Sequence, residues 1–233
     1  MVAALLGALL APAVPQESVN QLVSRMLKVY DATRMLDGQV VLTAMDGSGT
    51  TKMVTDIAYS APSKLLVRQV AQGSNPVTTL IVSNGEKFVY SPPEYLPSRG
   101  LLAEPVNDGG YIRQYREIYA VGAVGLADRS PALDILIARP DDLKALVGKF
   151  LTVDDLGSNT INGKQVRLVG GSYRDGSSNP AKYRMAIDAN GHLVQFVTQH
   201  TVYESGRAHS LSLVYDVNVT LGVAPDDARF RLP

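Results

Sequence analysis

The sequence has 233 residues, of which 45% are hydrophobic, and this is enough for one domain with a sizeable core. Its 22 basic and 22 acidic residues give zero net charge, which argues against nucleic acid as the main partner and against a strongly charged membrane-binding surface. Cysteine is absent, which excludes disulfides, thiolate metal sites, a cysteine nucleophile and acylation at an N-terminal cysteine.

The first segment, MVAALLGALLAPA, carries no charge. Its apolar run from Val2 to Leu10 is too short to span a bilayer. Ala11-Pro12-Ala13 matches the small-residue pattern that precedes a signal-peptidase site, although a positively charged start is missing. We interpret residues 1–13 as a signal peptide shortened at its N-terminus, followed by a single domain over 14–233; a frayed apolar terminus or a membrane anchor is the alternative.

Apolar residues at helical spacing predict an amphipathic helix over Gln16–Leu36, with Ser18 as its N-cap. From Leu36 the apolar period changes to two, and Asn-Gly pairs at 84–85, 162–163 and 190–191 predict hairpins with type I′ turns. Such half-polar alternation indicates an antiparallel sheet with one face in solvent. The predicted strands cover residues 36–45, 51–59, 64–71, 77–83, 87–91, 165–173, 182–188, 192–203 and 208–219.

The middle of the chain interrupts these strands. Residues 91–110 are predicted to form a long loop, whose leucines either cover a cavity or pin the loop to the core. Helical spacing then predicts helices over 111–124 and 130–139, and Asp141-Asp142 is predicted to open a third short helical turn. The chain is predicted to end in a short edge segment that inserts Phe230.

The candidates for metal or acid–base chemistry are few. If Ser205-Gly206 forms a two-residue turn, His200 faces Leu211 and His209 faces Val202, so the two histidines lie diagonally on one face. A metal needs a third ligand, which the sequence does not place clearly, and no nucleophile elbow, metalloprotease helix or P-loop is present. We therefore expect no metal, no cofactor and no catalytic residue, and a protein that is not an enzyme.

The remaining hypothesis is that the predicted fold binds an apolar ligand. A curved antiparallel sheet with apolar inward positions and a helical cover encloses an apolar cavity. Binding in such a cavity is driven by burial of apolar groups, worth about 0.8 kcal/mol per CH₂. A single long acyl chain is therefore held without any polar catalytic group.

Two segments, YSAPSKLLV at 59–67 and TTLIVSNGEKFVYSPP at 78–93, resemble the core of the LolA-like family of periplasmic outer-membrane lipoprotein carriers. The shared pattern is an aromatic residue, a proline that opens a strand, a strand ending in V-S-N-G, and an aromatic strand ending in Y-x-P. Further matches are LIAR at 136–139, YRMAIDANG at 183–191 and FRLP at 230–233.

The resemblance implies an α+β fold, namely an incomplete antiparallel β-barrel, or curved sheet, with helices covering its concave face. It implies a periplasmic or secreted carrier, expected to be monomeric, that holds acyl chains of lipids or lipidated proteins and exchanges them between an inner-membrane transporter and an outer-membrane acceptor. The family's carriers have an arginine directly before the strand-opening proline, where this chain has Ala61, which favours a divergent lipid-binding member. The alternative is an envelope-stress sensor domain of RseB type, which uses the same fold.

The residues expected to line the apolar cavity come from inward positions of the predicted strands and from the helix over 130–139. They are Leu42, Ile57, Tyr59, Leu65, Val67, Leu80, Val82, Phe88, Tyr90, Leu136, Met185 and Ile187.

Overall fold

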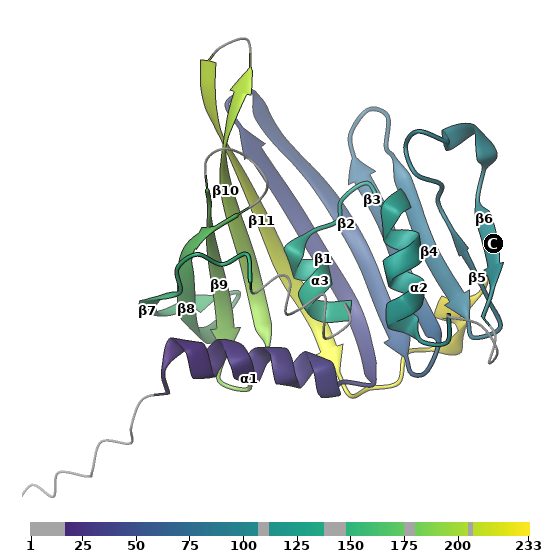
Figure 1. The fold of residues 1–233 in the computed structure, drawn as a ribbon, viewed down its shortest axis with the longest axis horizontal. Helices are drawn as coiled ribbons and strands as arrows, with labels where there is room; N and C mark the ends of the chain where they lie inside the picture. Colours follow the sequence, from purple (N-terminus) through teal and green to yellow (C-terminus); the bar gives the residue numbers. More distant parts are fainter. Residues whose placement is uncertain (1–16, 107–111, 138–147, 175–179, 205–206) are drawn as a thin grey trace, which may run out of the picture.

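The computed structural model describes residues 17–106, 112–137, 148–174, 180–204 and 207–233. Within these ranges all eleven strands form one antiparallel sheet in the order β6-β5-β4-β3-β2-β1-β11-β10-β9-β8-β7 (Figure 1). The strands are β1 (Met35–Asp46), β2 (Gly49–Ser60), β3 (Lys64–Gln72), β4 (Thr78–Asn84), β5 (Lys87–Tyr90), β6 (Leu102–Pro105), β7 (Asp154–Ile161), β8 (Lys164–Tyr173), β9 (Ala181–Asp188), β10 (Leu193–Glu204) and β11 (Arg207–Leu221).

The sheet consists of two meanders, β1–β6 and β7–β11, which are joined where the first strand pairs with the last. This β1–β11 ladder runs from Leu36↔Leu221 to Met45↔Ser212. Gly38 allows the two strands to approach closely, because a Cβ atom there would lie 2.1 Å from the Asn218 carbonyl oxygen. The sheet is curved and does not close, so the incomplete barrel predicted from the sequence is confirmed.

The first helix, α1 (Val19–Ala32), lies across one end of the sheet (Figure 1). Ser18 and Gln21 form a capping box at its start, which confirms the predicted N-cap. Its buried face consists of Leu22, Val23, Met26 and Tyr30. The helix ends four residues earlier than predicted, at Ala32 instead of Leu36. Thr33 caps it with extended dihedral angles, and β1 begins at Met35.

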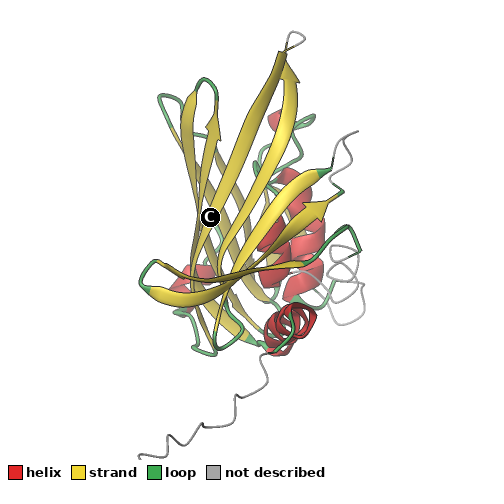
Figure 2. Ribbon diagram, turned by 90° about the vertical axis from the view of Figure 1, so that its left-hand side faces the viewer, coloured by secondary structure: helices red, strands yellow, loops and turns green. Residues whose placement is uncertain are grey.

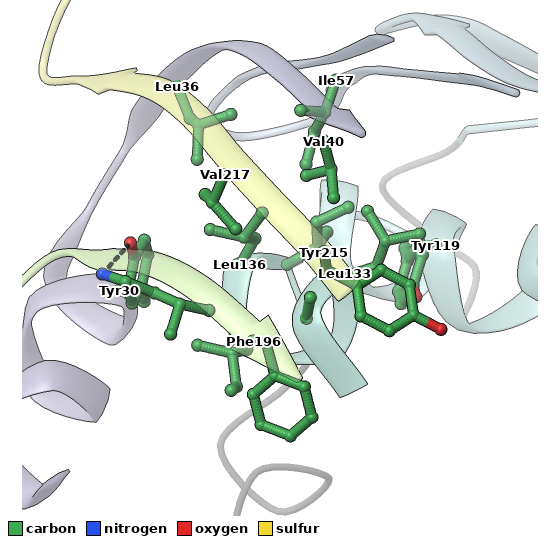
Figure 3. Packing of buried hydrophobic residues seen from close by; sticks show 14 of the residues in the cluster. Tyr30, Leu36, Val40, Ile57, Tyr119, Leu133, Leu136, Phe196, Tyr215 and Val217 are labelled. Carbon is green, nitrogen blue, oxygen red and sulfur yellow. Dashed lines mark hydrogen bonds between the residues drawn. The ribbon is translucent and has the colours of Figure 1, made fainter. Parts of the chain in front are cut away.

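Two more helices, α2 (Tyr115–Gly122) and α3 (Pro131–Ile137), pack on the middle of the same face (Figure 1). The view in Figure 2, turned by 90°, shows all three α-helices on one side of the sheet, which we call the concave face. Leu133 and Leu136 of α3 point towards Tyr215, Val217 and Phe196 of the sheet (Figure 3). The main hydrophobic core therefore lies between the helices and this face.

The opposite face carries two smaller apolar clusters. Phe230, which follows the sheet in a short 3₁₀ helix (Asp227–Phe230), packs on Ala58, Leu66 and Val82. The predicted insertion of Phe230 is therefore confirmed, although the segment is a 3₁₀ turn across the sheet face instead of an edge strand. The second cluster joins β8 to β9 and β10, and it comprises Val166, Leu168, Ala186 and Val194.

Some predicted elements differ from the structure. The predicted loop over 91–110 contains a 3₁₀ turn (Pro97–Arg99) and strand β6, which pairs with β5 through Tyr90↔Leu102. Of the three Asn-Gly turns only Asn162-Gly163 has two positive φ angles, 51° and 75°, as a type I′ turn requires. The predicted signal peptide over 1–13 and the helical turn at Asp141-Asp142 lie outside the described residues.

Candidate functional site

The candidate site is the concave face, and most residues predicted to line a cavity lie there. They belong to the core cluster or pack against it: Leu42, Ile57, Tyr59, Leu65, Val67, Phe88, Tyr90, Leu136, Met185 and Ile187. All of them except Leu42 are buried, so the helices already cover them. Their placement on this face agrees with the alternation in the sequence; whether they contact a ligand stays a prediction.

The placement of Leu80 and Val82 on this wall is wrong. Both side chains lie on the opposite face, in the cluster formed around Phe230. Val82 pairs with Leu66, while Ile81 pairs with Val67 and points to the helices. The error has a clear cause, since residues 80–82 form a continuous apolar run that is covered on both faces, and alternation alone cannot fix its phase.

The helices leave part of the concave face uncovered. In Figure 1 the ends of β1, β2, β10 and β11 extend well beyond α2 and α3. The ladder pairs Leu42↔Tyr215, Leu42↔Met53 and Ala44↔Leu213 place apolar side chains on this extension, facing the same way as the core. We call this surface the apolar strip; its members, all partly exposed, are Leu42, Ala44, Met53, Leu211 and Leu213.

A hydrogen-bonded latch marks the boundary between the helical cover and the apolar strip. The buried Gln69 side chain receives a bond from the Asp128 N–H (3.0 Å) and donates one to the Asp128 carbonyl oxygen (2.6 Å). Thr79 Oγ1 donates to Gln69 Oε1 (3.1 Å) and accepts from the Ala127 N–H (3.2 Å). The amide thus acts as an extra strand residue that fixes the segment between α2 and α3 on the sheet.

Asp128 also directs its carboxyl group inwards, where it accepts a bond from the Tyr215 hydroxyl at 3.4 Å. Burial raises the pKa of Asp128 to about 6; the Tyr215 hydrogen bond lowers it, and the nearby Asp134 carboxylate raises it. Because Tyr215 pairs with Leu42, this carboxyl group lies at the start of the apolar strip. An ionisable group is therefore placed between the cover and the strip.

Replacing Asp128 with asparagine is expected to stabilise the protein at pH 7.5, by on the order of 2 kcal/mol. A carboxyl group whose pKa is raised by folding costs stability once the unfolded chain ionises near pH 4, and the cost is complete above the folded pKa of about 6. The gain in Tm of D128N over the wild type should therefore shrink from pH 7.5 to pH 4 in thermal denaturation. A gain that is constant over this range would contradict the account.

The contact between α1 and α2 depends on Arg116. Its guanidinium donates to the Asp31 carboxylate (2.7 Å), to the carbonyl oxygens of Tyr30 (3.1 Å) and Asp31 (2.9 Å), and to the Tyr115 hydroxyl (3.0 Å). These carbonyls belong to the last turn of α1, where Arg116 adds donors to those of Thr33 and Arg34. We call Arg116 and its hydrogen-bond partners the clamp. The Tyr115 N–H donates to the Pro62 carbonyl oxygen (2.8 Å), so the clamp lies next to Ala61, where the lipoprotein carriers have their arginine.

The histidines have the register that the sequence predicts, with His200 opposite Leu211 and His209 opposite Val202. His200 Nε2 lies 3.3 Å from the Tyr173 hydroxyl and 3.0 Å from Thr198 Oγ1. In the part of the chain that the structure describes, no group of three or more histidine, aspartate or glutamate side chains is arranged to hold a metal ion. Likewise, none of the described helices has the length and apolar character needed to cross a bilayer.

Gln69, Asp128 and Arg116 were not among the residues predicted for the site. A signal for Gln69 is present in the sequence, since it continues the inward series of Leu65 and Val67 with a polar residue. Asp128 and Arg116 carry no comparable signal, because their partners are far away in the sequence.

Comparisons with known proteins show the fold. The structure matches MucB with a TM-score of 0.51 and 12% identity, over 92% of this chain and 62% of that chain. It also matches LprF from Mycobacterium bovis (TM-score 0.46, 12% identity, 90% of this chain and 96% of that one) and a LolA superfamily protein from Nitrosomonas europaea (TM-score 0.33, 9% identity, 93% and 99%). No family model and no curated protein matches the sequence.

The chain therefore shares with MucB a curved, open antiparallel sheet covered by helices on its concave face, which is the architecture that the sequence resemblance implies. It spans 62% of the MucB chain that it matches. At 12% identity, this match shows the arrangement of strands and helices alone.

Proposed function

We propose that this protein is an extracytoplasmic carrier or binding protein for acyl chains of lipids or lipidated proteins, and that it does no catalysis. The observation that supports the proposal is the apolar strip. Five partly exposed apolar side chains continue the concave face beyond the helical cover, on the side where a sheet of this kind has its core. Burying an acyl chain there stabilises the complex by about 0.8 kcal/mol per CH₂.

The polar surroundings fit an acyl chain better than a polar substrate. The latch saturates the Gln69 amide with backbone and side-chain partners, so it offers no free group to a ligand. In this proposal the chain enters over Leu211 and Leu213 at the free end of the sheet, passes Leu42 and Met53, and stops at Asp128. Transfer from an inner-membrane transporter to an outer-membrane acceptor is the finer form of the proposal, and the LolA-like fold supports it.

Met53→Asp is expected to weaken binding of a neutral acyl probe, such as a fluorescent monoacylglycerol, by at least about tenfold, because a carboxylate in the strip must be desolvated by the chain. The matched control is Val54→Asp, which places the same charge on the next residue of β2 and therefore on the opposite face. Fluorescence titration of both variants, with thermal denaturation to show that each is folded, measures the effect. Equal affinities of the two variants would contradict the proposal.

A second candidate is a domain that binds a regulatory protein, as in the RseB type of sensor. The similarity to MucB favours it, because a structure of MucB from Pseudomonas aeruginosa in complex with MucA also matches this chain. The two candidates differ in what the strip holds. A pull-down from the envelope fraction, followed by competition with the acyl probe, separates them. A recovered protein that displaces the probe would favour the sensor, and probe binding that the recovered proteins do not change would favour the carrier.

A further inference from the structure

Besides the apolar strip, the sheet has a groove on the face opposite the helices, with a volume of about 670 Å³. Its floor is the outer surface of β9, β10, β11 and the end of β1, and its wall is formed by the start of β7. The apolar side chains in the groove are Met45, Leu156, Val197 and Val214, and its cations are Lys182 and Arg184. The apolar strip does not contribute to it, and of the main core cluster only Tyr183 lines it; Val197 and Val214 point away from the helices.

The ladder register arranges these residues in two parallel rows across four strands. One row runs from Arg184 through Val197 to Val214, and the other from Lys182 through Gln199 and Ser212 to Met45. Strands lie about 4.8 Å apart, so the row that ends at Met45 extends roughly 14 Å from β9 to β1, and the row that ends at Val214 extends roughly 10 Å from β9 to β11. The groove is therefore long and narrow, with its two cations at one end and Met45 at the other.

Lys182 and Arg184 are two residues apart on β9, so their side chains project from one face about 6.5 Å apart. Both are exposed, and among the described residues neither forms an ion pair; Arg184 makes only a 3.4 Å bond to Gln195. By contrast, Arg68 and Arg229 elsewhere on this face are paired with Asp56 and Asp37. The one carboxylate in the groove is Asp154, on the β7 wall, so the β9 end keeps an excess of positive charge.

The wall over the groove is shaped by an irregularity in β7. The β7–β8 register shifts between Asp155 and Ser158, and Gly157 has a positive φ of 82°. A bulge of this kind re-aims a side chain, and here Leu156 rests on Gly170, whose missing Cβ would lie 2.6 Å from Leu156 Cδ1. Leu156 nevertheless stays 51% exposed, so an apolar ligand in the groove gains contact with it.

We propose that this groove binds a single-chain anionic amphiphile, with its anionic head between Lys182 and Arg184 and its chain along Val197 and Val214 towards Met45. The positive end selects the anionic head by charge, and the apolar floor beside it selects a head that carries a chain. The site is independent of the proposed function, since it lies on the other face of the sheet and shares no residue with the apolar strip.

Calorimetric titration with dodecyl phosphate, monolauroylglycerol and inorganic phosphate, each below any micelle concentration, tests the proposal. Lys182→Gln with Arg184→Gln is expected to weaken dodecyl phosphate binding by on the order of tenfold and to leave monolauroylglycerol unchanged. The matched control, Lys87→Gln with Lys164→Gln, removes the same charge from two exposed strand lysines outside the groove and should have no effect. Leu156→Asp, at an exposed position, should also weaken dodecyl phosphate binding.

Three results would overturn the proposal. If the control pair loses as much affinity for dodecyl phosphate as K182Q/R184Q, the effect comes from net charge alone. If inorganic phosphate binds as tightly as dodecyl phosphate, the alkyl chain contributes nothing to binding. An affinity for dodecyl phosphate that neither K182Q/R184Q nor L156D changes would place the ligand elsewhere. Failure of the carrier proposal gives a different result, because M53D then leaves monolauroylglycerol binding unchanged whatever the groove variants do.

Discussion

Phe230→Ala is expected to lower the free energy of unfolding by about 3–5 kcal/mol, as truncation of a buried phenylalanine generally does. Phe230 is 2% exposed and supplies the only aromatic ring among the members of its cluster on the face away from the helices. The Lys64 ammonium lies 5.9 Å from the centre of its ring and adds a cation–π contact. Without the ring, Ala58, Leu66 and Val82 lose their cover, because no α-helix packs on this face of β2–β4 in the described structure.

Urea denaturation measures this loss. The control is Tyr95→Ala, which removes an aromatic side chain that is 77% exposed and should change stability by less than about 0.5 kcal/mol. Similar effects of the two substitutions would show that the C-terminal segment does not pack on the sheet as described here.

Arg116→Met is expected to lower the free energy of unfolding by about 3 kcal/mol. Methionine keeps much of the length of the side chain but removes the guanidinium bonds to the Tyr30 and Asp31 carbonyl oxygens and to the Asp31 carboxylate. Those carbonyls end α1, and they keep only the long bonds from the Thr33 N–H to Tyr30 (3.3 Å) and from Arg34 to Asp31 (3.5 Å), so the end of the helix is held less firmly against α2. The loss should therefore appear as early opening of α1 and α2 from the sheet.

Hydrogen exchange followed by mass spectrometry distinguishes this local opening from general destabilisation. In R116M the amides of α1 and α2 should exchange faster than those of β1 and β11. Arg99→Met, which changes an exposed arginine, serves as the control and should exchange as the wild type does. Uniform acceleration over the whole sheet, or none in α1, would contradict the clamp.

Much of the fold follows from the sequence because the two periodicities are clear. The stretch from Leu36 to Tyr59 alternates strictly enough to fix both strands and their inward faces, and the capping residues at Ser18 locate the first helix. The Asn-Gly pairs locate the hairpins, although the turn at Asn84 is closed by its side chain, which accepts from the Glu86 and Lys87 N–H groups. Local chemistry thus decides the type of turn.

The remainder depends on contacts between distant residues. Strand β6 is four residues long and mostly exposed, so nothing in its own pattern distinguishes it from a loop until β5 is beside it. The inward residues of β4 are predicted wrongly for the same reason, since Phe230, from the far end of the chain, covers the outer face of this strand. The latch at Gln69 and the clamp at Arg116 also join residues that are far apart in sequence, and periodicity carries no information on such pairs.

In the proposed function the uncovered part of the concave face holds an acyl chain. Native mass spectrometry of the protein purified from its envelope fraction, without detergent exchange, tests this most directly. We expect a bound species with the mass of a lipid or acyl chain, displaced by added monoacylglycerol and reduced in M53D but not in V54D. Protein that is free of lipid in all three forms, and that takes up no monoacylglycerol, would contradict the account.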